Sequence, residues 1–267
     1  MCLDDPGVSM PFTFSHPAAV LPLRWTRLPF AALVIGSMSP DFIYFLQFGP
    51  YSGFGHTLPG VLLLDLPLGL ALYALYCWRL RAFLIALLPS FIQRRARPLT
   101  PSSSPQFSKA LRVVSAILLG AGTHILWDTF THAGAWGVAQ VPMLGRQVEV
   151  LGREIFIYKL AQHGSTFLGA GALLSWSAYS VWRSRPDPAR QPSPLGWRIR
   201  HLCALALLAP SAGLLSAYLQ IRLRGGDVSI YGAVVLTIVS AITVGFAYCC
   251  VCSVLPRLEP NASQNRR

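Results

Sequence analysis

Three residues near the middle of the chain have the types and spacing of metal ligands. His124, Asp128 and His132 lie in the stretch THILWDTFTH and are spaced i, i+4 and i+8. On an α-helix these residues project from one stripe, because each step of four residues turns the helix by about 40°. Neutral imidazole nitrogen and carboxylate oxygen both ligate zinc-like ions. The same pattern also suits an interfacial polar cap, in which these side chains hydrogen-bond to neighbouring helices.

The composition of the chain indicates a membrane protein. Of its 267 residues, 53% are hydrophobic and 12% are charged, and the mean hydropathy is +0.49. A soluble domain carries about 25% charged residues. The net charge of +12 would suit nucleic acid, but the arginines cluster beside apolar runs, as they do in the cytoplasmic loops of membrane proteins. We therefore expect membrane lipid around the chain and no nucleic-acid partner.

Six apolar runs predict an all-α polytopic membrane protein of about six transmembrane helices. The runs are residues 28–48, 57–78, 111–130, 158–182, 201–221 and 228–255, preceded by a short re-entrant or interfacial arm at 11–23. A basic, Pro-rich linker at 184–200 is expected to separate a motif-bearing membrane domain, residues 10–183, from a C-terminal helix pair at 201–255 and a polar tail at 256–267. The first nine residues are acidic, unlike a signal peptide, so Met10 is preferred over Met1 as the functional start.

The distribution of basic residues predicts which membrane face carries the candidate ligands. Most of the 22 lysines and arginines fall in segments that the positive-inside rule assigns to the cytoplasm, with both termini inside. Four separate elements then end at the outer face, and these ends carry Asp41, His56, Asp128, His132 and His163. His124 lies about two turns deeper. His16 joins them only if the arm at 11–23 re-enters the membrane and lines a protein cavity.

Five motifs resemble those of a known family. They are MPFTFSHPAAVLPL, GSMSPDF, GHTLPG followed by DLPLG, THILWDTFTH, and YKLAQHGS. Together they are similar to the bacterial membrane family called domain of unknown function 4184, over residues 10–182. The resemblance implies a protein of the bacterial inner membrane and brings no established activity.

A second resemblance concerns the order of the candidate ligands. The order His, Asp, His, His-x3-Asp, His is similar to that of zinc-dependent phospholipase C, of related single-strand nucleases, and of inner-membrane proteins described as metal-dependent hydrolases. This resemblance implies a multi-zinc centre in which Asp128 or Asp41 bridges two ions. The phospholipase family is soluble and has an acidic ligand where His163 stands. The implied ligands are His16, Asp41, His56, His124, Asp128 and His132.

These observations predict a metal-dependent hydrolase that acts on a phosphoester or lipid-like substrate at the outer membrane face. We expect a divalent metal, with zinc as the first candidate. His163 is included as a further candidate ligand. The main alternative is a transporter in which the same buried residues relay protons or bind a transported cation. A membrane scaffold without chemistry is the third reading. Asp65 is expected to serve helix packing, since it lies nine residues after His56, about half a turn round a continuous helix.

Overall fold

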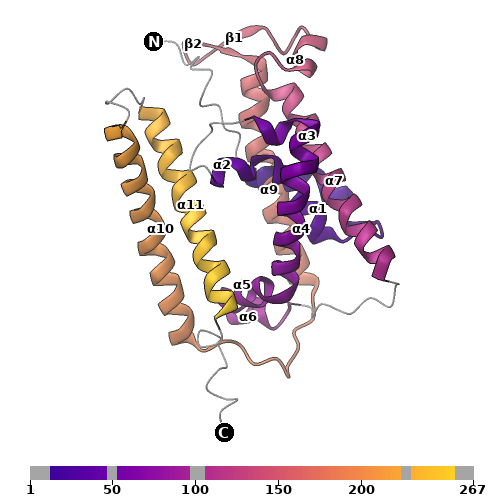
Figure 1. Ribbon diagram of the computed structural model, residues 1–267, viewed down its shortest axis with the longest axis vertical. Helices are drawn as coiled ribbons and strands as arrows, with labels where there is room; N and C mark the ends of the chain where they lie inside the picture. Colours follow the sequence, from indigo (N-terminus) through magenta and orange to yellow (C-terminus); the bar gives the residue numbers. More distant parts are fainter. Residues whose placement is uncertain (1–12, 47–52, 97–105, 224–229, 256–267) are drawn as a thin grey trace. The chain divides into compact units, whose positions relative to one another are not determined.

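The computed structural model of the chain describes residues 13–46, 53–96, 106–223 and 230–255 (Figure 1). The expected start at Met10 and the polar tail at 256–267 lie outside these described residues. The chain divides into two compact units. The first comprises Met1–Ile43, Ser52–Tyr73 and Ser103–Ser177, and it contains every candidate site residue; the second comprises Tyr44–Tyr51, Ala74–Ser102 and Ala178–Arg267.

The described chain is helical apart from one β-hairpin, which confirms the all-α class. The short helices of the first half are η1 (Thr13–Trp25), α1 (Phe30–Gly36), η2 (Ser39–Asp41), α2 (Phe42–Leu46), η3 (Phe54–His56), α3 (Leu58–Gly60), η4 (Val61–Asp65), α4 (Leu66–Leu75), η5 (Tyr76–Leu80), α5 (Arg81–Leu87) and α6 (Ser90–Gln93). The remaining helices are α7 (Gln106–Thr131), α8 (Trp136–Gln140), α9 (Ile157–Arg183), α10 (Leu195–Leu223) and α11 (Ile230–Val254). Strands β1 (Gln147–Val150) and β2 (Arg153–Phe156) pair antiparallel in the segment between α8 and α9.

Four helices of the described chain are long and apolar enough to cross a membrane. They are Leu58–Leu87, Ser108–Thr131, Leu195–Leu223 and Gly232–Val254. The expected first span at 28–48 is instead a shorter apolar helix, Phe30–Leu46, broken by the Ser39–Pro40–Asp41 turn. The expected fourth span forms α9, a 27-residue helix that does not reach the same hydropathy. The chain is thus a helical protein with membrane-spanning character, while the count of six spans stays a prediction.

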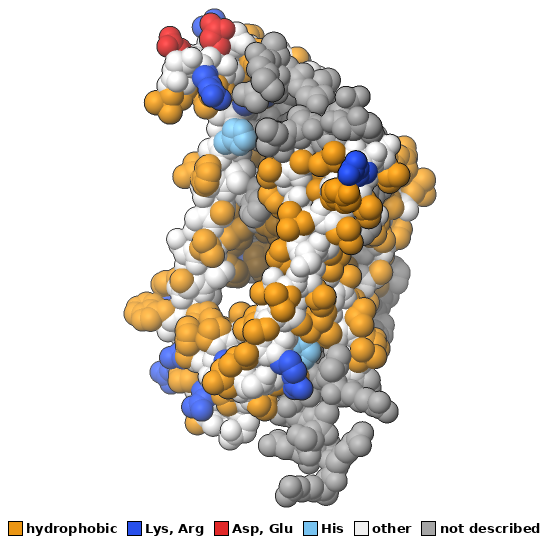
Figure 2. Space-filling view, turned by 90° about the vertical axis from the view of Figure 1, so that its left-hand side faces the viewer, with side chains coloured by type: hydrophobic (Ala, Val, Ile, Leu, Met, Phe, Trp, Pro, Cys, Tyr) orange, Lys and Arg blue, Asp and Glu red, His pale blue; other side chains and the backbone are white. Residues whose placement is uncertain are grey.

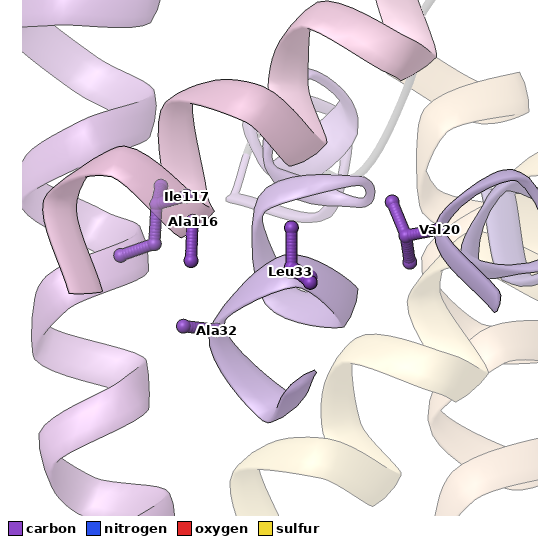
Figure 3. Packing of buried hydrophobic residues seen from close by; sticks show 5 residues of the cluster. All are labelled: Val20, Ala32, Leu33, Ala116 and Ile117. Carbon is purple, nitrogen blue, oxygen red and sulfur yellow. The ribbon is translucent and has the colours of Figure 1, made fainter. Parts of the chain in front are cut away.

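The core of the first unit packs α1 between η1 and α7. Leu33 of α1 lies between Val20 of η1 and Ala116 of α7, and these side chains are fully buried (Figure 3). Two glycines allow α1 and α7 to approach at backbone distance. A Cβ atom at Gly36 would lie 2.2 Å from the carbonyl oxygen of Ile117, and one at Gly120 would lie 2.4 Å from that of Leu33. This close crossing sets the position of the end of α1 relative to α7, and hence of the candidate ligands on both.

The second unit is organised around α10 and α11, which lie side by side (Figure 1). Gly213 of α10 allows a close approach, since a Cβ atom there would lie 2.4 Å from the carbonyl oxygen of Thr237 in α11. His201 Nδ1 and the Tyr248 hydroxyl also pair across them at 2.7 Å. Hydrophobic side chains predominate on the face drawn in Figure 2, and Lys and Arg gather toward its ends, as expected for helices that face lipid.

Candidate metal centre

Five of the predicted ligands come together in the first unit, although they belong to four elements. His16 is part of η1, Asp41 ends η2, His56 ends η3, and His124 and Asp128 lie on α7. Asp41 and His124 are 1% and 0% exposed, and the side chain of His56 is 22% exposed. The cluster is therefore buried but is open on the side of His56.

Four ligand atoms form a closed ring of alternating oxygen and nitrogen. His124 Nε2 lies 3.2 Å from Asp128 Oδ2 and 3.5 Å from Asp41 Oδ1. His56 Nε2 lies 3.3 Å from Asp128 Oδ2 and 3.5 Å from Asp41 Oδ1. Ligands bonded at 2.0–2.1 Å to a tetrahedral zinc ion lie about 3.3 Å from one another. The four adjacent distances of this set, called the ligand ring below, are close to that value.

Two atoms of the ligand ring have no hydrogen bond within the described residues. They are Asp41 Oδ1 and His124 Nε2, and both are buried. A buried polar atom without a partner is costly, so native structures rarely leave one. The two atoms lie 3.5 Å apart with no hydrogen bond between them. That arrangement fits a bound cation better than an interfacial polar cap.

The other edges of the same side chains are held by neighbouring groups. His124 Nδ1 lies 2.8 Å from the carbonyl oxygen of Ser37, which fixes the tautomer with a proton on Nδ1 and leaves Nε2 as the ligand atom. The Thr13 hydroxyl donates to Asp41 Oδ2 at 2.6 Å, which leaves Oδ1 for the ligand ring. The Ser39 hydroxyl donates to the carbonyl oxygen of Gly36 and closes the turn that carries Asp41. These contacts orient the ligands as outer-shell groups do in metal sites.

If the cluster holds a divalent metal, replacing Thr13 by Val is expected to lower the affinity for it by about 10- to 100-fold, the usual effect of losing an outer-shell partner. The isosteric side chain keeps the packing but cannot donate to Asp41 Oδ2. Thr129→Val is the matched control, because that hydroxyl only donates to the carbonyl oxygen of Leu126 in its own helix. Competition with a metal-binding dye would compare the two variants, and equal affinities would contradict the role of Thr13.

His16 lies against the ligand ring rather than in it. Its imidazole stacks on that of His124 with ring centroids 3.8 Å apart, and its Nε2 lies 3.7 Å from Asp128 Oδ1. Burial and the neighbouring His124 lower the pKa of His16 to about 4, so its imidazole is neutral at pH 7 and able to ligate. His16, His124 and Asp128 form a second candidate ligand group, which shares His124 with the group of Asp41, His56 and His124. The arm at the N-terminal end therefore does reach the cluster.

His132 and His163 are placed differently from these five residues. His132 follows the last residue of α7, and its Nδ1 lies 3.1 Å from the backbone oxygen of Asp128 and 3.8 Å from Asp128 Oδ1. Its Nε2 lies 3.4 Å from Gln162 Nε2, so it sits at the rim of the site. His163 is exposed and belongs to neither candidate ligand group, because the preceding residue, Gln162, is the one that α9 turns inward.

Several groups at the site carry little signal in the sequence. The carbonyl of Ser37 is a backbone group, which no residue pattern reveals. Thr13 lies in the FTFSH motif three residues before His16, and only that proximity could have indicated it. Asp65, expected to serve packing, has a fully buried side chain in the same unit, and neither of its carboxylate oxygens has a hydrogen-bond partner in the described chain.

Comparison with known proteins identifies the family of the chain but not its activity. A search of curated proteins and a search of solved structures found no match. The family described as "Domain of unknown function (DUF4184)" matches residues 10–254. This match extends beyond the motifs at 10–182 and includes the C-terminal helix pair. Since the family covers most of the sequence, the chain belongs to the DUF4184 family.

Proposed function

We propose that the protein is a membrane-embedded, metal-dependent hydrolase. The observation that carries the proposal is the ligand ring, with four nitrogen and oxygen atoms spaced by 3.2–3.5 Å and drawn from three elements. Asp41, His56, His124 and Asp128 are proposed to hold one divalent ion, and imidazole with carboxylate makes zinc the first candidate. His16 and His132 stand beside the ion as further groups, and His163 has no part in the proposed centre.

The chemistry proposed is the hydrolysis of an ester by an activated water. A bound zinc ion would supply Lewis acidity and lower the pKa of a water to about 7. Asp128 would hold the ion through Oδ2, while its Oδ1 lies outside the ligand ring and has no hydrogen-bond partner in the described chain. That oxygen can accept a proton or orient the attacking water. Asp41, tied to Thr13, keeps a fixed orientation and acts as a ligand.

The proposed substrate is a phosphoester or another lipid-like amphiphile. The spans Leu58–Leu87 and Ser108–Thr131 both contribute to the first unit, so the site is built among helices suited to a bilayer. The partly exposed side chains of His56 and His132 provide its approach, at 22% and 26% exposure. We further propose a location in the bacterial inner membrane, with both termini in the cytoplasm and the site toward the outer face, as the distribution of basic residues favours.

Metal content and turnover test this function together. Full-length protein purified in detergent should carry at least one divalent ion per chain by mass spectrometry and should hydrolyse a phosphodiester probe such as p-nitrophenyl phosphorylcholine. Metal with no turnover on esters, but with metal-coupled ion flux in proteoliposomes, would favour the transporter. A wild-type chain that binds no divalent ion and stays folded with chelator would refute the hydrolase.

His56 and His163 are both candidate ligands from the sequence, but their replacement by alanine should affect the metal content differently. We expect His56→Ala to lose the bound ion, because its Nε2 is one corner of the ligand ring. His163→Ala should retain the wild-type metal content, because that side chain is exposed and outside both candidate ligand groups. Mass spectrometry of the two variants beside wild type makes the measurement. Equal metal loss in both would show that the ligand set is wrong.

A further inference from the structure

Asp65 is a third buried carboxylate in the first unit, and the proposed centre does not use it. Its side chain is 0% exposed, and both of its oxygens lack a hydrogen-bond partner in the described chain. Among the described residues no Lys or Arg forms an ion pair with it. A carboxylate taken out of water without a partner is strongly disfavoured. Buried in this way, the carboxyl group is either protonated or accompanied by a compensating positive charge.

The position of Asp65 brings it beside the candidate ligands. Asp65 ends η4, Asp41 ends η2 and His56 ends η3, and these three elements contact one another. A Cβ atom at Gly55 would lie 2.2 Å from the carbonyl oxygen of Pro40 and 3.2 Å from Asp65 Oδ1. The carbonyl oxygen of Pro40 and Asp65 Oδ1 therefore both lie beside Gly55, where η2, η3 and η4 meet. The titratable groups close enough to interact electrostatically with Asp65 are Asp41, His56 and His124.

The charges of the cluster do not balance with a single ion. Histidines that ligate a metal are neutral, so they contribute no positive charge once the ion is bound. Asp41, Asp128 and Asp65 then present three negative charges to one divalent cation. In a buried site the remaining negative charge needs a further positive charge close to Asp65.

We propose that Asp65 and the carbonyl oxygen of Pro40 belong to a second cation site adjacent to the ligand ring. The known contributors are all oxygens, which suit a hard divalent ion such as Mn²⁺, Mg²⁺ or Ca²⁺, whereas the ligand ring offers the mixed nitrogen and oxygen set of a zinc-like ion. The inference deepens the proposed function, on which its charge count rests. The second ion would balance the centre and lie next to the ion that activates the water.

Manganese binding to the chelator-treated full chain tests the second site, because Mn²⁺ accepts both oxygen and nitrogen ligands. Equilibrium dialysis with detergent-solubilised protein should give two Mn²⁺ per wild-type chain and one per Asp65→Asn chain. The amide keeps the shape of the side chain and removes its charge. Glu149→Gln, on the exposed hairpin, is the control and should keep two ions. Asp65→Ser provides a second test if the amide variant does not fold, as judged by its elution profile.

The outcomes separate the second site from the proposed hydrolase centre. One ion in wild type that persists in Asp65→Asn would overturn the second site and leave the ligand ring intact; Asp65 would then be a protonated or packing residue. A single ion in wild type that is lost in Asp65→Asn but retained in Asp128→Asn would support the second site and overturn the proposed centre. Two ions in both wild type and Asp65→Asn would also overturn the role of Asp65.

Discussion

Asp128→Asn is expected to abolish metal binding at the ligand ring, and with it hydrolysis, while leaving the protein folded. Asp128 is the most connected side chain of the cluster: Oδ2 faces His56 and His124, and Oδ1 faces His16 and His132. The substitution preserves volume but removes the anion that the cation requires. Since outer-shell changes alone cost about 10- to 100-fold in metal affinity, loss of this ligand should cost more than about 100-fold. Metal content and phosphodiesterase rate, measured on the same preparation, report both effects.

The control for this variant is Asp187→Asn. Asp187 is an exposed residue of the second unit whose carboxylate accepts a hydrogen bond from the backbone of Ala189. Its substitution removes one negative charge from the chain without touching the cluster, so metal content and rate should match wild type. Retention of the metal in Asp128→Asn, with only a slower rate, would mean that Asp128 acts on the substrate and is not a ligand.

Of the three candidate ligands predicted from their spacing on α7, His124 and Asp128 lie in the cluster and His132 lies at its rim. His124 and Asp128 lie within the helix, so the i, i+4 rule places both on one stripe. The rule does not by itself place His132, because α7 ends at Thr131, and His132 Nδ1 lies 3.1 Å from the carbonyl oxygen of Asp128. The sequence has no helix-terminating residue just before His132. The nearest one, Gly134, comes two residues after it. Helix ends are the least predictable feature of such a pattern.

The relation of His56 to Asp65 was mispredicted for a different physical reason. Nine residues on a continuous α-helix place two side chains on opposite faces, but the chain is not one helix here. Thr57 is extended, with φ −110° and ψ 153°, and caps α3 by accepting a hydrogen bond from the backbone of Gly60. The π-helical turn Val61–Asp65 then changes the phase of the side chains. Breaks of this kind depend on tertiary packing, and they bring His56 and Asp65 into one unit.

The membrane character of the chain was predictable, whereas the count of spans was not settled by hydropathy. The expected span at 28–48 is apolar enough, but Pro40 follows Ser39 and opens a 3-10 turn that ends in Asp41. Proline within an apolar run breaks the regular helix, and the break lets a carboxylate leave the helix and join the cluster. The turn at Ser39–Asp41 thus interrupts the expected span and also supplies the candidate ligand Asp41.

Gly120→Ala is expected to destabilise the fold and to lower metal affinity, although Gly120 contacts no metal ligand side chain. A Cβ atom there would lie 2.4 Å from the carbonyl oxygen of Leu33 and 2.6 Å from the backbone nitrogen of Ser37. These are backbone atoms, so α1 and α7 must separate. Overpacking of this kind costs about 1–3 kcal/mol. The separation would also lengthen the 2.8 Å contact between His124 Nδ1 and the carbonyl oxygen of Ser37.

Gly122→Ala provides a matched control two residues away on the same helix. A Cβ atom at Gly122 would meet nothing within 4 Å, so the substitution adds a methyl group without strain. It should raise helix stability slightly, since alanine is favoured over glycine by about 0.5–1 kcal/mol. Thermal unfolding in detergent and metal titration of both variants should therefore diverge in opposite directions. Equal thermal stability and metal affinity in the two variants would mean that the close crossing of α1 and α7 does not position His124. That result would also contradict the orienting role of the Ser37 carbonyl.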